Sequence, residues 1–220
     1  MGELRQNRKA IQIAAKANAD NIDCLVISFV NDPLPRLYSN TALLDKAKES
    51  LYYSRLNHLI RILDILEKRK IITKVLTKNA NILEIAHIRD SYDFITLGCS
   101  ITTNVYNESV TKYFEPNTSS IRDRLLALNL LNKHGFKTWV SIEPILPNTN
   151  VLGLIHSLVS RNVSEIWIGK NNYDPELMFA FNWKQLCKTL LKYQPLYYPK
   201  LKIKLELLKA GGIIHAKSQF

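Results

Sequence analysis

The sequence contains few of the residues that mark disulfide-bonded, fibrous or membrane proteins. Its three cysteines, Cys24, Cys99 and Cys187, are too far apart for a CxxC pair or a Cys/His zinc pattern. Only 7 glycines and 8 prolines occur in 220 residues, which excludes collagen-like and low-complexity chains. No apolar run could span a bilayer, and no secretory segment is present. We therefore expect a reducing, cytoplasmic setting, no membrane association, and no metal site built by this chain alone.

Acidic residues are also in the minority. The chain has 19 Asp and Glu against 30 Lys and Arg, which gives a net charge of +11. This excess favours an anionic partner such as nucleic acid, although a compositional bias toward Lys, Asn and Ile explains it equally well. The length and the 46% hydrophobic content predict one globular domain over residues 1–220.

Helical and strand patterns alternate along the whole chain. Apolar residues at helical spacing predict helices, and short β-branched runs between them predict strands. Ser120 and Asp123 indicate a capped helix start, and Gly135 indicates where that helix ends. The expected helices cover residues 3–20, 41–70, 81–89, 120–135, 151–161 and 182–193. The expected strands cover 24–29, 71–78, 94–103, 137–144, 165–172 and 200–207. This order predicts an α/β fold with a mainly parallel sheet, either open or closed as a barrel.

Most of the expected strands end in polar residues, and parallel strands bring such ends to one rim. The clearest case is the stretch TWVSIEP, where Trp139, Ser141 and Glu143 alternate with Thr138, Val140 and Ile142. In a barrel the first set would face the interior and the second would face the helices. A buried carboxylate is costly unless it is paired, so Glu143 is expected to have a partner. That partner is either a bound ligand or a structural cation or helix cap.

Several motifs occur in one order: SFVNDPLP, VLTKNANI, CSITT, FEP, RLLALNLLNKHGFKTWVSIEPILP and IWIGKNNY. In this order the chain resembles radical SAM proteins of the spore photoproduct lyase-like group, also called DNA repair photolyases. The resemblance covers residues 22–173, with 174–220 as a C-terminal extension of a helix and a strand. It implies a partial (β/α)6 TIM-type barrel in which S-adenosylmethionine lies across the strand ends and ligates a 4Fe-4S cluster. Reductive cleavage would then start radical chemistry on a substrate, with nucleic acid as one candidate class.

The resemblance also implies positions for the cofactor-binding residues. They lie at or just after the strand ends: Asp32, Lys78, Ser100, Thr102, Glu143, Lys170 and Asn171. Their hydroxyl, amide and charged groups suit the ribose, ammonium and carboxylate groups of S-adenosylmethionine. Residue chemistry alone leaves another interpretation open for each, because Asp32 precedes a proline and forms turns, and the lysines, the asparagine and the hydroxyls also occur as ordinary strand ends. Trp139 and Trp167 are expected to be packing residues, and Glu115 with Arg124 a structural pair.

One feature of the resembled proteins is absent. Their first strand leads into a CxxxCxxC loop that ligates the cluster, and this sequence has no such loop. The first strand of the barrel is therefore expected to be missing, with an open sheet edge that would associate with a separate segment or with another copy. Two hypotheses remain: a radical SAM protein that is truncated and inactive alone, or a non-catalytic basic α/β protein that binds nucleic acid or a protein partner. A serine hydrolase is disfavoured because no GxSxG motif occurs.

Overall fold

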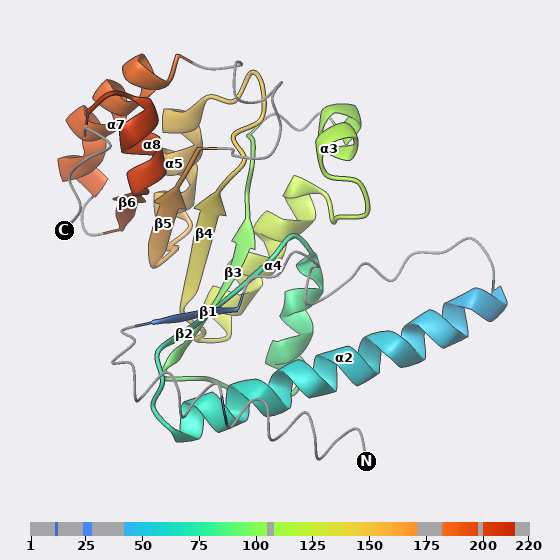
Figure 1. Ribbon diagram of the computed structural model, residues 1–220. Coiled ribbons are helices and arrows are strands. Elements are labelled where there is room, and N and C mark those ends of the chain that lie inside the picture. Colours follow the sequence, from blue (N-terminus) through green and yellow to red (C-terminus); the bar gives the residue numbers. More distant parts are fainter. Residues whose placement is uncertain are drawn as a thin grey trace.

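The computed structural model describes residues 12, 24–27, 42–104, 108–170, 182–197 and 200–213. In these ranges strands and helices alternate, as Figure 1 shows. The strands are β1 (Leu25–Ile27), β2 (Thr73–Thr77), β3 (Ile95–Ser100), β4 (Thr138–Ile142), β5 (Glu165–Ile168) and β6 (Leu201–Ile203). The helices are α2 (Ala42–Lys68), η1 (Ala80–His87), α3 (Glu108–Phe114), α4 (Ile121–Lys133), α5 (Val151–Ser160), α7 (Trp183–Tyr197) and α8 (Leu205–Ala210).

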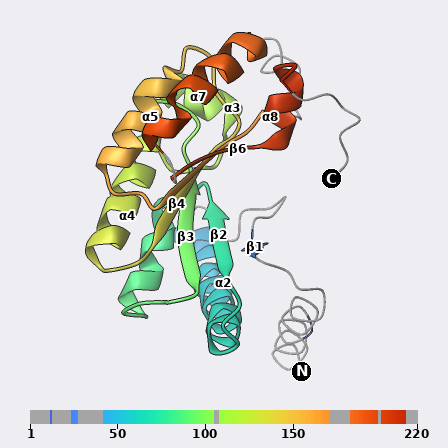
Figure 2. The ribbon, with the colours of Figure 1, turned by 90° about the vertical axis from the view of Figure 1, so that its left-hand side faces the viewer.

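All six strands form one parallel sheet in the order β1-β2-β3-β4-β5-β6. The sheet curls into a half-barrel, and α4 and α5 lie along one side of it (Figure 2). We call the face that these helices cover the outer face and the opposite one the inner face. The predicted α/β partial barrel of parallel strands is therefore confirmed.

The core lies between the outer face and the helices. Alternate strand residues are buried there because successive side chains point to opposite faces of a sheet. On β3 these are Ile95, Leu97 and Cys99, each with 0% exposure. The long helix α2 adds an apolar stripe at helical spacing, made of Leu56, Leu59, Ile60, Leu63 and Leu66. The pattern that predicted the helix over 41–70 is the pattern that buries it.

The capped start of α4 is also confirmed. The Ser120 hydroxyl accepts a hydrogen bond from the backbone N–H of Asp123 at 3.1 Å, which satisfies one of the free amides of the first turn. Gly135 follows the helix with a φ of 85°, a left-handed conformation that glycine adopts without a steric penalty. The helix therefore begins and ends where the sequence predicts.

Three expectations differ from the structure. The strand predicted over 200–207 ends at Ile203, and the chain then turns into α8, which places Leu207 in the core at 0% exposure. The helix α3 lies in a polar stretch for which no helix was predicted. The helix predicted to end at residue 193 continues to Tyr197. The helix predicted over 3–20 lies outside the described residues, apart from Gln12.

Candidate functional site at the carboxyl ends of the strands

The carboxyl ends of the strands meet at one rim of the half-barrel, because all strands run in the same direction. Four of the predicted site residues lie there: Lys78 follows β2, Ser100 ends β3, Thr102 comes two residues later, and Glu143 follows β4. Lys170 lies two residues after β5 and is half-buried. Asp32 and Asn171 lie outside the described residues. Their assignment to a binding site stays a prediction.

A buried carboxylate, Glu115, organises the β2 and β3 side of this rim. Its Oε1 lies 2.8 Å from Lys78 Nζ, and its Oε2 lies 2.8 Å from Arg124 Nη2. The Thr102 hydroxyl donates a hydrogen bond to the same Oε2 at 3.1 Å. The side chains of Glu115 and Arg124 have 0% exposure, whereas that of Lys78 has 35%. The predicted pair of Glu115 and Arg124 is confirmed, and two predicted site residues are tied to it.

The charge of Glu115 is maintained despite its burial. Burial alone raises the pKa of this carboxyl, but the positive charges of Arg124 and Lys78 and their hydrogen bonds outweigh that effect, so the pKa is lowered. Two cations share one carboxylate in this cluster, which leaves one positive charge in excess. The more exposed cation, Lys78, is the one that can present this charge to a ligand.

Arg124 also fixes the chain around the rim. Its guanidinium donates to the Ser119 carbonyl at 2.9 Å, to the Ser100 carbonyl at 2.9 Å and to the Thr118 hydroxyl at 2.6 Å. A planar group with five donors can hold several acceptors at fixed angles, which lysine cannot do. Arg124 therefore ties the end of β3 to the loop that precedes α4.

Glu143 lies on the opposite side of the rim and is ion-paired to Lys204, which follows β6. The expectation that Glu143 has a partner is confirmed, and the partner is a cation of this chain. The pair lies across Gly169, because a Cβ at that position would lie 2.7 Å from Glu143 Oε2 and 2.8 Å from Lys204 Cδ. Both side chains are partly exposed, at 23% and 30%. A side chain at position 169 would therefore displace Glu143 and Lys204 from their present positions.

Hydroxyl groups lie between these two charged pairs on the inner face. Ser100 on β3 and Ser141 on β4 are register partners, so their side chains are neighbours on the same face. Ser100 is 4% exposed and Ser141 is 2% exposed. The predicted site residues included Ser100 but not Ser141, although the alternation in TWVSIEP already placed Ser141 on the inner face.

The rim therefore offers both signs of charge and neutral hydroxyls within one curved edge. Such a set can bind a ligand that carries an ammonium, a carboxylate and ribose hydroxyls, because each of these groups finds a complementary partner. Lys204 was not predicted from sequence. It is separated from Glu143 by 61 positions, and only the alternating residues of KLKIKLEL indicated that a strand would bring a lysine to this rim.

The cysteines do not fit an iron-sulfur cluster. Cys99 is buried on the outer face, Cys187 is buried in α7, and Cys24 precedes β1 at the other end of the sheet. In the described ranges no three His, Cys, Asp or Glu side chains come together as metal ligands. A 4Fe-4S cluster needs several thiolates at one place, and these three cysteines do not provide them.

No helix in the described part of the chain has the length and apolar character needed to cross a membrane.

Comparison with known proteins gives matches in structure only. No protein-family model matches the sequence, and no curated protein sequence matches it. Among solved structures, SuiB of Streptococcus suis bound to S-adenosylmethionine aligns with a TM-score of 0.50 and 15% identity, over 97% of this chain and 57% of SuiB. A second SuiB structure gives the same values. Spore photoproduct lyase complexed with dinucleoside spore photoproduct aligns with a TM-score of 0.45 and 15% identity, over 67% of this chain and 56% of the lyase.

The chain thus spans somewhat more than half the length of SuiB, and at 15% identity the likeness concerns the fold. SuiB is a radical SAM enzyme, so the fold that the resemblance implied is confirmed. The chain therefore has the fold of the radical SAM enzymes, a partial barrel of parallel strands with helices on its outer face.

Proposed function

We propose that the rim of the half-barrel binds S-adenosylmethionine. The observation that supports this most is the position of Lys78, Ser100, Thr102 and Glu143 at the carboxyl ends of parallel strands, where such folds bind their ligands. SuiB, whose fold this chain shares, has been solved with S-adenosylmethionine bound. Asp32, Lys170 and Asn171 belong to the same proposed site by their place after β1 and β5.

Each residue would bind the group of S-adenosylmethionine that complements its charge or its hydrogen-bonding capacity. Glu143 suits the ammonium or the ribose hydroxyls, Lys78 or Lys170 suits the carboxylate, and the hydroxyls of Ser100 and Thr102 suit the ribose. Arg124 and Glu115 would not bind the ligand, because their charged groups already bind each other and other groups of the chain. They would hold Lys78 and Thr102 in position instead.

We further propose that residues 1–220 act as one domain of a radical SAM-type protein, located in the cytoplasm, that depends on cluster ligands from another polypeptide segment. This chain would contribute the binding and orientation of S-adenosylmethionine. A separate segment with the cluster loop would be its partner, and nucleic acid is the substrate class that the charge of +11 favours.

The test is a titration of the purified chain with S-adenosylmethionine by isothermal calorimetry, with no cluster present. We expect saturable binding that Glu143→Gln weakens about tenfold, which corresponds to the loss of one charge-assisted hydrogen bond of about 1.4 kcal/mol. Asp64→Asn is the matched control, because it removes an ion pair with Arg89 that lies away from the rim, and it should bind normally. Absence of any saturable binding to the wild-type chain would contradict the proposal.

The alternative is a non-catalytic barrel whose basic surface binds nucleic acid. It predicts binding to DNA or RNA that weakens steeply as salt rises, because each neutralised phosphate releases counterions. Strong nucleic-acid binding without any affinity for S-adenosylmethionine would favour this second function over the first.

A further inference from the structure

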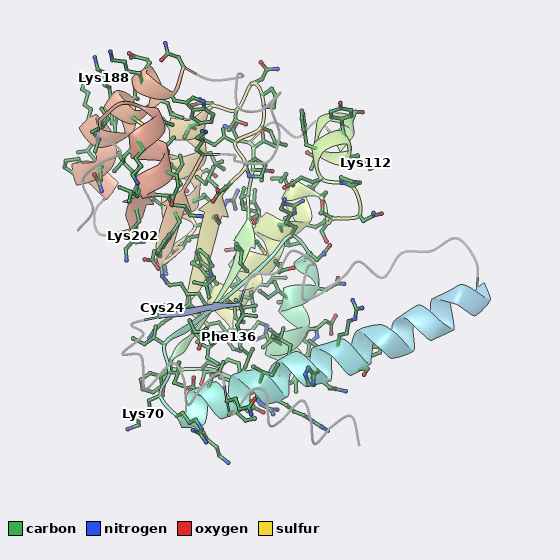
Figure 3. All side chains as sticks on the ribbon, viewed as in Figure 1. Cys24, Lys70, Lys112, Phe136, Lys188 and Lys202 are labelled. Atoms are coloured by element: carbon green, nitrogen blue, oxygen red, sulfur yellow. The ribbon has the colours of Figure 1, made fainter. Side chains whose placement is uncertain are left out.

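A second cluster lies on the inner face at the opposite end of the strands. It consists of Lys74 on β2, Glu165 on β5, Lys202 on β6, and the indoles of Trp139 and Trp167. Four of them stand at the first or second residue of their strands, and Trp167 is the third residue of β5. Figure 3 shows Lys202 and Cys24 toward the same end of the sheet. We call the five residues the brace.

Two lysines share one carboxylate in the brace. Lys74 Nζ pairs with Glu165 Oε2, and Lys202 Nζ lies 2.5 Å from Glu165 Oε1. The side chains of Lys74 and Glu165 are largely buried, at 11% and 14% exposure, while that of Lys202 is half exposed. Ion pairs shielded from water in this way are screened less by salt than those of surface residues.

The indole rings fill the space around the lysines. Lys74 Nζ lies 4.9 Å from the ring centroid of Trp167 and 5.6 Å from that of Trp139, within the range of cation–π attraction. The two rings meet edge to face, with centroids 6.3 Å apart. The expectation that both tryptophans are packing residues is consistent with these contacts. They pack on charged groups as well as on apolar ones.

Trp139 crosses a neighbouring strand to complete the brace. Its Nε1–H donates to the Val75 carbonyl of β2 at 2.8 Å, although Trp139 belongs to β4 and β3 lies between them. This path needs Gly98 on β3, because a Cβ there would lie 2.3 Å from the Trp139 Cδ1 atom. The ring therefore connects β2 to β4 directly across the inner face.

The ion pair spans an even larger gap. From β2 to β5 there are three strand steps, which in a flat sheet would separate the backbones by about 14 Å. Inward side chains of a flat sheet stand parallel, so the tips of Lys74 and Glu165 would stay about that far apart. They are in contact because the sheet curls. The ion pair therefore joins β2 and β5 directly across the inner face of the half-barrel.

From these observations we infer that the brace sets the curl of the sheet and thereby positions the two halves of the rim. Lys78 and Glu115 lie on the β2 and β3 side of the rim, and Glu143 and Lys204 lie on the β4 and β6 side. The brace links the same two sides at the other end of the strands. Loosening it would let the sheet flatten, and the two charged pairs of the rim would move apart. This role is independent of which ligand the rim binds.

The experiment measures the curl directly by pulsed electron spin resonance between two spin labels. Labels at Asn57→Cys on α2 and Glu206→Cys on α8 report the separation of the β2 and β6 sides, and both positions are exposed. All proteins carry Cys24→Ser, and the two remaining cysteines are buried. Glu165→Gln keeps the shape of the side chain and removes the charge that both lysines share. We expect a longer mean distance and a broader distribution than in the unmodified brace.

Asp64→Asn is again the control, because it breaks an ion pair with Arg89 that does not cross the inner face. It should lower stability without changing the distance. If Glu165→Gln fails to fold, Lys74→Met removes the ion pair between β2 and β5 and leaves the pair of Lys202 with Glu165 in place. Unchanged distance distributions in a folded brace variant would overturn the inference and reduce the brace to a stabilising contact.

Discussion

The strongest test of the rim architecture is the removal of Arg124. In Arg124→Met the aliphatic stem is roughly preserved, while four polar contacts are lost, to Glu115, Ser100, Ser119 and Thr118. Among the described residues, Glu115 then stays buried with Lys78 and the Thr102 hydroxyl as its partners. Removing one partner of a buried ion pair costs about 3–5 kcal/mol, because the other charge is left uncompensated. We expect a loss of that size in the free energy of unfolding.

The assay is urea unfolding at pH 7, followed by the fluorescence of the tryptophans and by circular dichroism. The matched control is Arg122→Met, two residues earlier on α4 and exposed, which should change stability by no more than about 0.5 kcal/mol. The double variant Arg124→Met with Glu115→Gln should be more stable than Arg124→Met alone, since it no longer buries a charge with a single cation. A cost below about 1 kcal/mol for Arg124→Met, typical of a surface ion pair, would refute the buried-cluster argument.

Two further predictions follow from close contacts and from lowered pKa values. Gly98→Ala should destabilise the fold by about 1–3 kcal/mol in urea unfolding, because its methyl group would force the Trp139 ring off β3; an unchanged midpoint would contradict this. The hydrogen bond from Arg89 lowers the pKa of Asp64, so its stabilisation is present above the ordinary carboxyl pKa and is lost as pH falls through the lowered value. Wild-type stability should therefore fall more steeply on acidification than that of Asp64→Asn, and parallel pH profiles would argue against it.

The element order could be predicted from the sequence because the pattern of burial is periodic. A stripe at helical spacing predicted α2, and the alternation in TWVSI placed Trp139 and Ser141 on the face opposite Val140. The end of β6 could not be predicted in the same way. KLKIKLEL alternates throughout, yet the chain leaves the sheet after Ile203, because a helix there buries Leu207 against the core. Tertiary packing decided between two local structures that the pattern allowed.

The candidate site was predictable only in part, for a different reason. Glu143 was identified because a charge at the end of an apolar strand needs a partner, and that argument uses neighbouring residues alone. The identity of the partner depends on which strands meet at the rim. Lys204 and Glu143 are 61 positions apart in the sequence, and Lys74 and Glu165 are 91 positions apart. Pairs of this kind become visible only when the order and curl of the sheet are known.

The face of the sheet to which a cysteine side chain points also decides whether that cysteine could bind a cluster at the rim. Cys99 shares the outer face of β3 with Ile95 and Leu97, and it would reach the inner face only if the strand slipped by one residue. Such a slip would move Ile95 and Leu97 out of the core and would place Ser100 under the helices. The observed register of β3 is therefore strongly specified.

The other two cysteines are held elsewhere in the fold. The Cys187 thiol donates to the Leu207 carbonyl at 3.1 Å and packs on Gly211, where a Cβ would lie 2.5 Å from its sulfur, so it fixes α7 against α8. Cys24 lies beside Lys74 and Glu165 at the opposite end of the strands, where burial raises the pKa of its thiol and disfavours the thiolate that iron requires. Cys99 thus lies on the outer face, Cys187 between two helices, and Cys24 at the opposite end of the strands. A cluster bound at the rim by three thiolates would need cysteines that these 220 residues do not contain.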